Sequence, residues 1–297
     1  PTWTSDGPKA LSFDAAFKSG GLEQAPQPAE TATMKTKTLL IGAAVAATLV
    51  ACATTTSPTG RKQYVGAVSQ EQLNQLGAQS FAQMKTQKAQ TTSAAQRNYV
   101  SCVTNAIVAQ LPANARSGWE TAVFVDEDPN AFALPGGKVG VYTGIFKVAR
   151  DQDQLAGVIA HEIGHVVSRH HDERITRQMG AQAGVQLLGA LAGNYGNLAS
   201  QGGSLLAQTG FLLPGSRAQE SEADVVGQQL MAQAGFDPRG AVNLWQNMIS
   251  AGGSRPPQWL STHPDPQARI GELQSRAADL VPTMQAARKA GKTPRCQ

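Results

Sequence analysis

The sequence lacks several features that would point to common classes of protein. Only 5% of its 297 residues are aromatic and 15% are charged, and its Lys and Arg residues are scattered with no run longer than two although the net charge is +4. A nucleic-acid interface has clustered basic residues and aromatic side chains that stack on bases, so we expect no nucleic-acid partner. No uninterrupted apolar stretch reaches the roughly 18 residues of a membrane-spanning helix.

Cysteine is also scarce, with three residues and no CxxC pair, which excludes a cysteine-based zinc site. The first, Cys52, follows Met34, two lysines and an apolar run, in the order of a secretory signal. The run ends in LVAC, which resembles a bacterial lipobox. This resemblance implies cleavage before Cys52, its lipidation and, because Ala53 follows, sorting to the outer membrane. The alternative is an ordinary signal peptide that ends in a cysteine by chance.

Two cysteines, Cys102 and Cys296, then remain in an oxidising compartment. An even pair there predicts a disulfide, which would join the C-terminal tail to an early helix. The alternative is a pair of free thiols.

Four of the five histidines lie in one stretch of eleven residues, HEIGHVVSRHH. On a helix its HExxH motif places His161 and His165 on one face, about 5–6 Å apart, where both imidazoles can bind one metal ion. Glu162, next to the first histidine, can act on a water at that ion. Asp151 can cap such a helix, and Gly164 within it predicts close packing against another element.

A catalytic zinc site needs a third protein ligand, and one candidate is His171. It falls on the third histidine of the metzincin pattern HExxHxxGxxH, but Ser168 stands in place of the glycine. The residues that follow predict a continuing helix, on which His171 would lie about 15 Å from His161 along the axis. His170 and His171 are therefore expected to be solvated surface residues.

The second candidate lies downstream, in the stretch ESEAD. On a helix Glu220 and Asp224 share one face, whereas Glu222 points nearly the opposite way. Glu220 could bind the metal while Asp224 accepts a hydrogen bond from a ligand histidine and fixes its tautomer. The alternative is a charged, solvated helix face.

Four motifs in order resemble the gluzincin metallopeptidase family of HtpX, the CAAX prenyl endopeptidases, BepA and LoiP. They are NAFALPGGKVGVYTG, HEIGH, SRxxExEAD and STHPDPQARI. With the lipobox, the nearest resemblance is to LoiP-type outer-membrane lipoproteins. The resemblance implies one Zn²⁺ per chain held by His161, His165 and Glu220, with Glu162 as the general base and Asp224 as a partner of a ligand histidine.

The same resemblance implies a role for His263 in the THP motif. That histidine either stabilises the oxyanion or occupies the open position of zinc in a resting state. Arg217 and Arg269 also match motif positions. Unlike HtpX and the prenyl endopeptidases, this chain has no predicted transmembrane helices, and residues 178–214 are expected to form a short helix and a loop.

The expected fold class is α+β, a mostly helical zincin-like metallopeptidase with a small antiparallel sheet beside the active-site cleft. Strands are predicted at Thr121–Val125 and Val139–Thr143, with Pro135–Gly137 in the turn between them. C-terminal helices are predicted at about 238–250 and 265–280.

The chain divides into four predicted parts. Residues 1–33 are a non-native or mis-set extension, 34–51 the lipoprotein signal peptide, 52–66 the lipidated cysteine with a polar tether, and 67–297 the metallopeptidase domain.

The predicted function is that of a zinc endopeptidase of the bacterial cell envelope, lipid-anchored to the outer membrane and facing the periplasm. Its substrates would be misfolded or damaged proteins, bound along a strand edge, and outer-membrane assembly machinery is a further expected partner. One alternative is a chaperone-like assembly lipoprotein with latent or structural zinc. The other is a scaffold in which HExxH occurs by chance.

Overall fold

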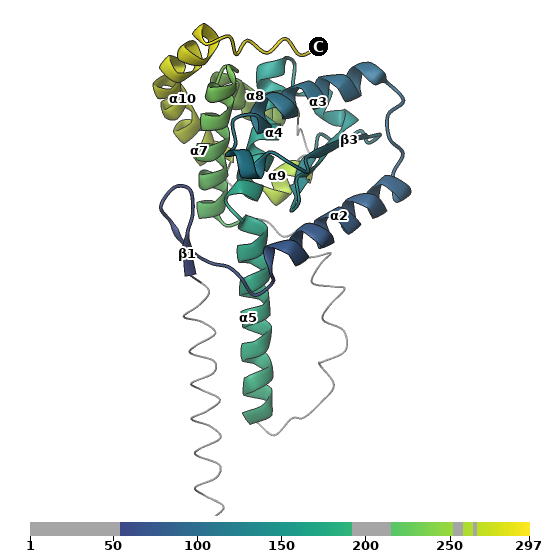
Figure 1. Ribbon diagram of the computed structural model, residues 1–297, viewed down its shortest axis with the longest axis vertical. Helices are drawn as coiled ribbons and strands as arrows, with labels where there is room; N and C mark the ends of the chain where they lie inside the picture. The colour runs from purple at the N-terminus through teal and green to yellow at the C-terminus, as the bar shows by residue number, and fades with distance from the viewer. Residues whose placement is uncertain (1–53, 192–214, 252–257, 264–265) are drawn as a thin grey trace, which may run out of the picture. The chain divides into compact units, whose positions relative to one another are not determined.

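The computed structural model describes residues 54–191, 215–251, 258–263 and 266–297. These residues are mostly helical with two small sheets, which confirms the α+β class. The helices are α2 (Gln70–Gln87), α3 (Ala94–Val108), α4 (Gln152–Val167), α5 (His170–Leu191), α7 (Arg217–Ala234), α8 (Arg239–Ala251), α9 (Gln258–Thr262) and α10 (Pro266–Lys289) (Figure 1). The predicted helices at about 238–250 and 265–280 are therefore confirmed. The predicted signal peptide and Cys52 lie outside the described residues, as does 192–214 of the segment 178–214 predicted to form a short helix and a loop.

Helix α4 forms the centre of the hydrophobic core. Nearly every residue from Gln154 to His165 is buried, because α3, α7, α8 and the sheet all pack against this helix. Its N-terminus is capped as predicted, since the Asp151 carboxylate accepts a hydrogen bond from the backbone N–H of Gln154 (2.8 Å). Small residues allow the close approach: a Cβ added at Gly157 would lie 2.9 Å from the Cα of Ala241 in α8.

The predicted continuation of the HExxH helix through residue 178 is wrong. Helix α4 ends at Val167, and Arg169 adopts a positive φ of 54° before α5 begins at His170. The resulting change of direction turns the first residues of α5 inward. His170 and His171 are therefore 0% and 5% exposed, which contradicts the prediction that they are solvated.

A three-stranded sheet, in the order β3–β5–β4, lies beside α4. Strands β3 (Glu120–Phe124) and β5 (Lys138–Tyr142) match the two predicted strands, but they pair in parallel rather than as a hairpin. The turn at residues 135–137 instead joins β5 to β4 (Ala131–Leu134), a strand absent from the prediction. A tight turn can join only neighbouring antiparallel strands, so the sheet is mixed.

The segment predicted as a polar tether is partly structured. Strands β1 (Thr54–Thr56) and β2 (Lys62–Tyr64) form an antiparallel hairpin. At its turn Arg61 makes ion pairs of 2.8 Å with Glu173 in α5 and with Glu222 in α7. A tether would make no such contacts, so the ordered body of the protein begins earlier than residue 67.

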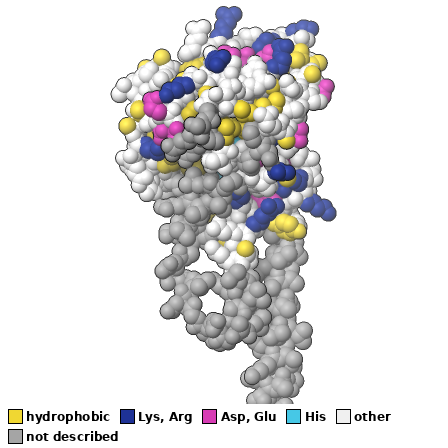
Figure 2. Space-filling model, turned by 180° about the vertical axis from the view of Figure 1, so that it is seen from behind, with side chains coloured by type: hydrophobic (Ala, Val, Ile, Leu, Met, Phe, Trp, Pro, Cys, Tyr) yellow, Lys and Arg dark blue, Asp and Glu magenta, His cyan; other side chains and the backbone are white. Residues whose placement is uncertain are grey.

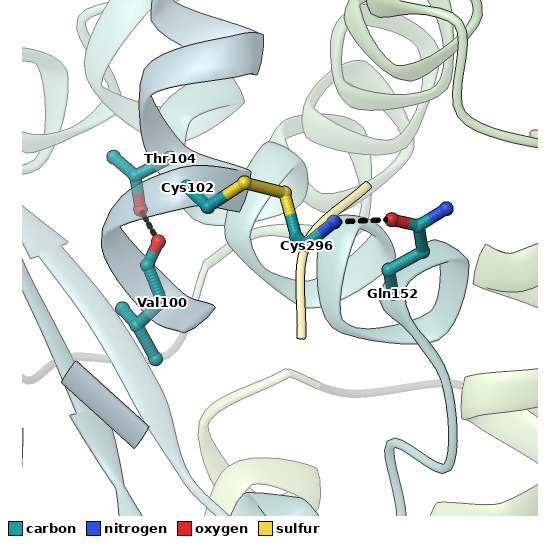
Figure 3. The surroundings of a disulfide bond; sticks show 5 residues. All are labelled: Val100, Cys102, Thr104, Gln152 and Cys296. Carbon is teal, nitrogen blue, oxygen red and sulfur yellow. Dashed lines mark hydrogen bonds between the residues drawn. A yellow bond between two sulfur atoms is a disulfide. The ribbon is translucent and has the colours of Figure 1, made fainter. Parts of the chain in front are cut away.

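Cys102 in α3 and Cys296 near the C-terminus are joined by the disulfide that the sequence predicts (Figure 3). The backbone N–H of Cys296 also donates a hydrogen bond to the side chain of Gln152, the first residue of α4 (2.9 Å). The disulfide links residues 194 positions apart, so it ties the C-terminal tail to the helices of the core.

None of the helices in the described part of the chain is long and apolar enough to cross a membrane. On the face shown in Figure 2, Lys and Arg side chains lie at several separate places among acidic and apolar ones. This distribution agrees with the scattered basic residues of the sequence.

Candidate metal centre and active site

The first half of the site comes from α4. His161 and His165 lie one turn apart, are each 3% exposed, and bring their Nε2 atoms within 3.0 Å of each other. The other ring nitrogen, Nδ1, contacts Asp224 in His161 and His170 in His165. The two Nε2 lone pairs are therefore available at a single point.

Helix α7 supplies the carboxylate that faces this point. The two side-chain oxygens of Glu220 lie 3.4 Å from Nε2 of His161 and 3.4 Å from Nε2 of His165. Helices α4 and α7 approach closely because a Cβ added at Gly164 would lie 2.8 Å from the carbonyl oxygen of Ala223. The predicted close packing of Gly164 is confirmed. Glu220 lies 55 or more positions after the two histidines in the sequence. It meets them because Gly164 leaves room for the backbone of α7.

A fourth ligand atom, the third nitrogen, comes from His263, which follows α9. His161, His165, Glu220 and His263 each offer one ligand atom, and these atoms all lie within 4.8 Å of one another. Within the described residues Oε1 of Glu220 is buried without a hydrogen-bond partner. A buried carboxylate whose two oxygens each face an imidazole Nε2, one of them without a hydrogen-bond partner, fits a metal ion, since an unsatisfied buried acceptor is otherwise costly.

The electrostatics of the cluster also favour a cation. Burial and the Arg269 guanidinium oppose protonation of His161, yet the hydrogen bonds that its ring donates to the carboxylates of Asp224 and Glu220 outweigh them and raise its pKa to about 9. Burial opposes ionisation of Glu220 as well, but the positive charges of His263, His161 and Arg269 lower its pKa to about 2. The site therefore holds a carboxylate that stays ionised and, at His161, an imidazole whose carboxylate partners favour positive charge.

Glu162 lies next to the ligand cluster without belonging to it. Its Oε1 accepts a hydrogen bond from the indole Nε1 of Trp259 (3.1 Å) and lies 3.3 Å from Nε2 of His263. Burial would raise the pKa of this carboxyl, but His263, His161 and the Trp259 hydrogen bond together lower it. Glu162 is thus an ionised, oriented base at the edge of the cluster.

Asp224 takes the position that the sequence predicts for it, one turn after Glu220. Its Oδ1 is 2.9 Å from Nδ1 of His161, which orients that ring with Nε2 toward the cluster. Arg269 in α10 bonds both Asp224 (2.7 Å) and Glu220 (2.9 Å), and its guanidinium lies 4.1 Å from the ring centre of Trp245. Arg217, which also matches a motif position, is exposed at the start of α7.

The structure reveals a second group that the sequence did not predict. Nδ1 of His165 lies 2.8 Å from Nδ1 of His170, and Nε2 of His170 lies 3.1 Å from Oε2 of Glu222. Glu222 is 3% exposed. The sequence places it on the helix face opposite Glu220 and Asp224, and that face is also buried here. The one available signal was the unusual density of histidines around residue 165. His171 is absent from the ligand cluster, so the metzincin alternative finds no support.

A cleft runs past these residues along the sheet. It is lined by residues of β4 with Asn130, by Met84 and Tyr142, and by the site residues Glu162, His165, Glu220 and His263. His171 and Arg174 of α5 complete its wall. The cleft therefore reaches three of the four residues of the ligand cluster, and its lining contains both apolar and polar side chains.

Comparison with known proteins identifies the fold family. Residues 94–277 match the model of Peptidase family M48. The chain is 40% identical to the mitochondrial metalloendopeptidase OMA1 of Schizosaccharomyces pombe over 178 residues, which cover 59% of this chain and 51% of that protein. It is 32% identical to the beta-barrel assembly-enhancing protease of Escherichia coli over 166 residues, 53% of this chain and 34% of that protein.

The matched region thus spans about half or less of the length of these curated relatives. The region that matches the family model, residues 94–277, contains the two helices that meet at the ligand cluster, α4 and α7, and the sheet that lines the cleft. Because the family model matches well over half of the sequence, the chain belongs to peptidase family M48.

Proposed function

We propose that this protein is a zinc-dependent endopeptidase. The observation that supports it best is the convergence of two Nε2 atoms on the buried carboxylate of Glu220, whose Oε1 has no hydrogen-bond partner. His161, His165 and Glu220 would hold the ion, a His₂Glu set typical of catalytic zinc sites. An ion held by these residues would supply Lewis-acid chemistry, lowering the pKa of a bound water to about 7 and polarising the scissile carbonyl.

The chain's own residues would move the proton. Glu162, ionised and held by the indole of Trp259, takes a proton from the attacking water and passes it to the leaving amine. His263 lies 3.3 Å from Glu162, and the Trp259 carbonyl and Thr262 hydroxyl contact its Nδ1 (3.0 and 2.9 Å). This arrangement directs Nε2 of His263 into the site, where it can donate to the oxyanion.

Strand β4 provides the place for the substrate. Its one partner strand among the described residues is β5, and it lines the cleft beside Glu162 and His165. The other edge of the sheet is already partly covered, because the backbone of Thr91 bonds Val123 in β3 and that of Ala89 bonds Val125 just after it. An extended peptide would therefore pair with β4, and backbone pairing tolerates many substrate sequences.

The proposed substrates are misfolded or damaged outer-membrane proteins. Support comes from the lipobox at Cys52, which would anchor the chain to the outer membrane with this domain in the periplasm. A second support is the relative named beta-barrel assembly-enhancing protease. Outer-membrane assembly machinery is accordingly a proposed partner.

The test compares wild type with Glu162→Gln on unfolded casein, with and without a chelator. We expect the substitution to abolish cleavage and leave zinc content unchanged, because Glu162 is not one of the three proposed zinc ligands, His161, His165 and Glu220. Cleavage at equal rates by both proteins would refute the mechanism.

A second candidate function is supported by His263. Its imidazole belongs to the ligand cluster, so it could occupy the position that substrate needs and keep the zinc latent in a chaperone-like lipoprotein. His263→Ala should then raise cleavage of casein, whereas the oxyanion role requires that it lower cleavage.

A further inference from the structure

His165 has a more extended set of partners than His161, and this difference carries a further inference. The Nδ1 atom of His161 contacts a carboxylate directly, at Asp224. The Nδ1 atom of His165 instead contacts a second imidazole, His170, which in turn contacts Glu222. The side chains of His170 and Glu222 are both buried, at 0% and 3% exposure.

The proton positions along this chain follow from the donors and acceptors. An ionised carboxylate can only accept a hydrogen bond, so Nε2 of His170 must carry its proton toward Glu222. Nδ1 of a neutral His170 then has a lone pair and can only accept. Nδ1 of His165 must therefore be the donor, and this tautomer leaves its Nε2 lone pair facing Glu220 and the metal position.

The end of the chain is fixed by the N-terminal hairpin. Oε1 of Glu222 accepts a hydrogen bond from the Thr59 hydroxyl (2.6 Å), and Oε2 accepts one from Nε of Arg61 (2.8 Å). The terminal nitrogens of Arg61 bind both oxygens of Glu173 in α5 (2.9 and 2.8 Å). A guanidinium with two carboxylate partners from two helices has a single orientation.

We propose that His170 and Glu222 are positioning residues for the metal ligand His165, and that Arg61 extends this chain into the β1–β2 hairpin. The hairpin is then a structural part of the metal site rather than a spacer before the domain. This inference rests on the proposed zinc site. It predicts that changes far from the ligands alter zinc affinity and not only stability.

The test measures zinc affinity by competition with a fluorescent chelator, using full-length wild type, His170→Phe and Glu222→Gln. Loss of a partner that orients a ligand histidine weakens metal binding about 10–100-fold, and we expect this for His170→Phe. Glu222→Gln should weaken zinc less, because its amide oxygen can still accept from His170.

His171→Phe is the matched control. It is the same substitution at the next buried histidine, which takes no part in the hydrogen bonds that link His165, His170 and Glu222. We expect it to bind zinc as wild type does. Zinc affinity equal to wild type in His170→Phe would overturn the inference, as would an equal loss in His171→Phe. If His170→Phe does not fold, Glu222→Leu, which leaves Nε2 of His170 without its acceptor, decides in the same way.

The zinc content of the wild-type protein distinguishes a failure of the proposed function from a failure of this inference alone. If wild type itself holds no zinc, the proposed function and this inference fail together. If wild type binds zinc and His170→Phe binds it equally, the positioning chain alone is refuted. A merely structural role would lower the unfolding temperature of metal-free protein and leave the zinc affinity unchanged.

Discussion

Substitution of Gly164 by Ala tests whether the contact between α4 and α7 positions the ligands. The added Cβ would lie 2.8 Å from the backbone oxygen of Ala223, about 0.6 Å less than the 3.4 Å of an ordinary contact. Neither atom belongs to a flexible side chain, so the helices must separate. Glu220 lies on α7 and the two histidines on α4, and zinc–ligand distances tolerate only about 0.2 Å.

We expect Gly164→Ala to weaken zinc binding by about tenfold or more, since misplacement of about 1 Å can cost a factor of about 100. Overpacking should also lower the free energy of unfolding of the metal-free protein by about 1–3 kcal/mol. Zinc affinity is measured by chelator competition and stability by urea unfolding. These effects oppose the better helix propensity of Ala, which favours the variant by about 1 kcal/mol.

Gly180→Ala is the control, because an added Cβ at this exposed position of α5 meets nothing within 4 Å. It should stabilise the protein by about 0.5–1 kcal/mol and leave zinc affinity unchanged. If Gly164→Ala bound zinc as tightly as wild type, close helix approach would not be what places Glu220, and the reasoning would be refuted.

Two further predictions concern stability. Replacing both Cys102 and Cys296 by Ala should lower the free energy of unfolding by about 2–5 kcal/mol, since the disulfide closes a very long loop; unchanged urea midpoints for the variant and for reduced wild type would contradict this. The pKa of Asp224 is about 2 against an ordinary 3.8, because Arg269 outweighs the effect of burial. Its ionisation therefore stabilises the fold above about pH 4, and this contribution is lost as the pH falls toward 2. Urea midpoints of metal-free Asp224→Asn should fall less than those of wild type across that range.

Local features of the structure were predictable from the sequence. Asp151 caps α4 and Gly164 packs against a neighbouring helix because capping and close approach depend on single residues and their immediate neighbours. The proposed pairing of His161 with His165 follows from helical periodicity alone. Glu220 needed more than spacing, because a carboxylate in ESEAD is also compatible with a solvated helix face.

Other features depend on tertiary contacts that no local pattern encodes. The break between α4 and α5 occurs at Ser168 and Arg169, where neither glycine nor proline marks it. Once the chain turns there, His170 becomes buried against α7, and its contact with Glu222 follows. Strand β4 was missed because four residues, AFAL, are too short for a periodic signal.

The indole rings around the ligand cluster have a practical consequence. The rings of Trp245 and Trp259 have their centres 4.5 Å apart, and Trp259 also lies 5.8 Å from His161 and 4.7 Å from His263. The sequence contains four tryptophans, so a large share of the ultraviolet-excited emission should come from beside the proposed zinc position. Intrinsic fluorescence should therefore report metal loading and peptide occupancy directly, without any attached dye.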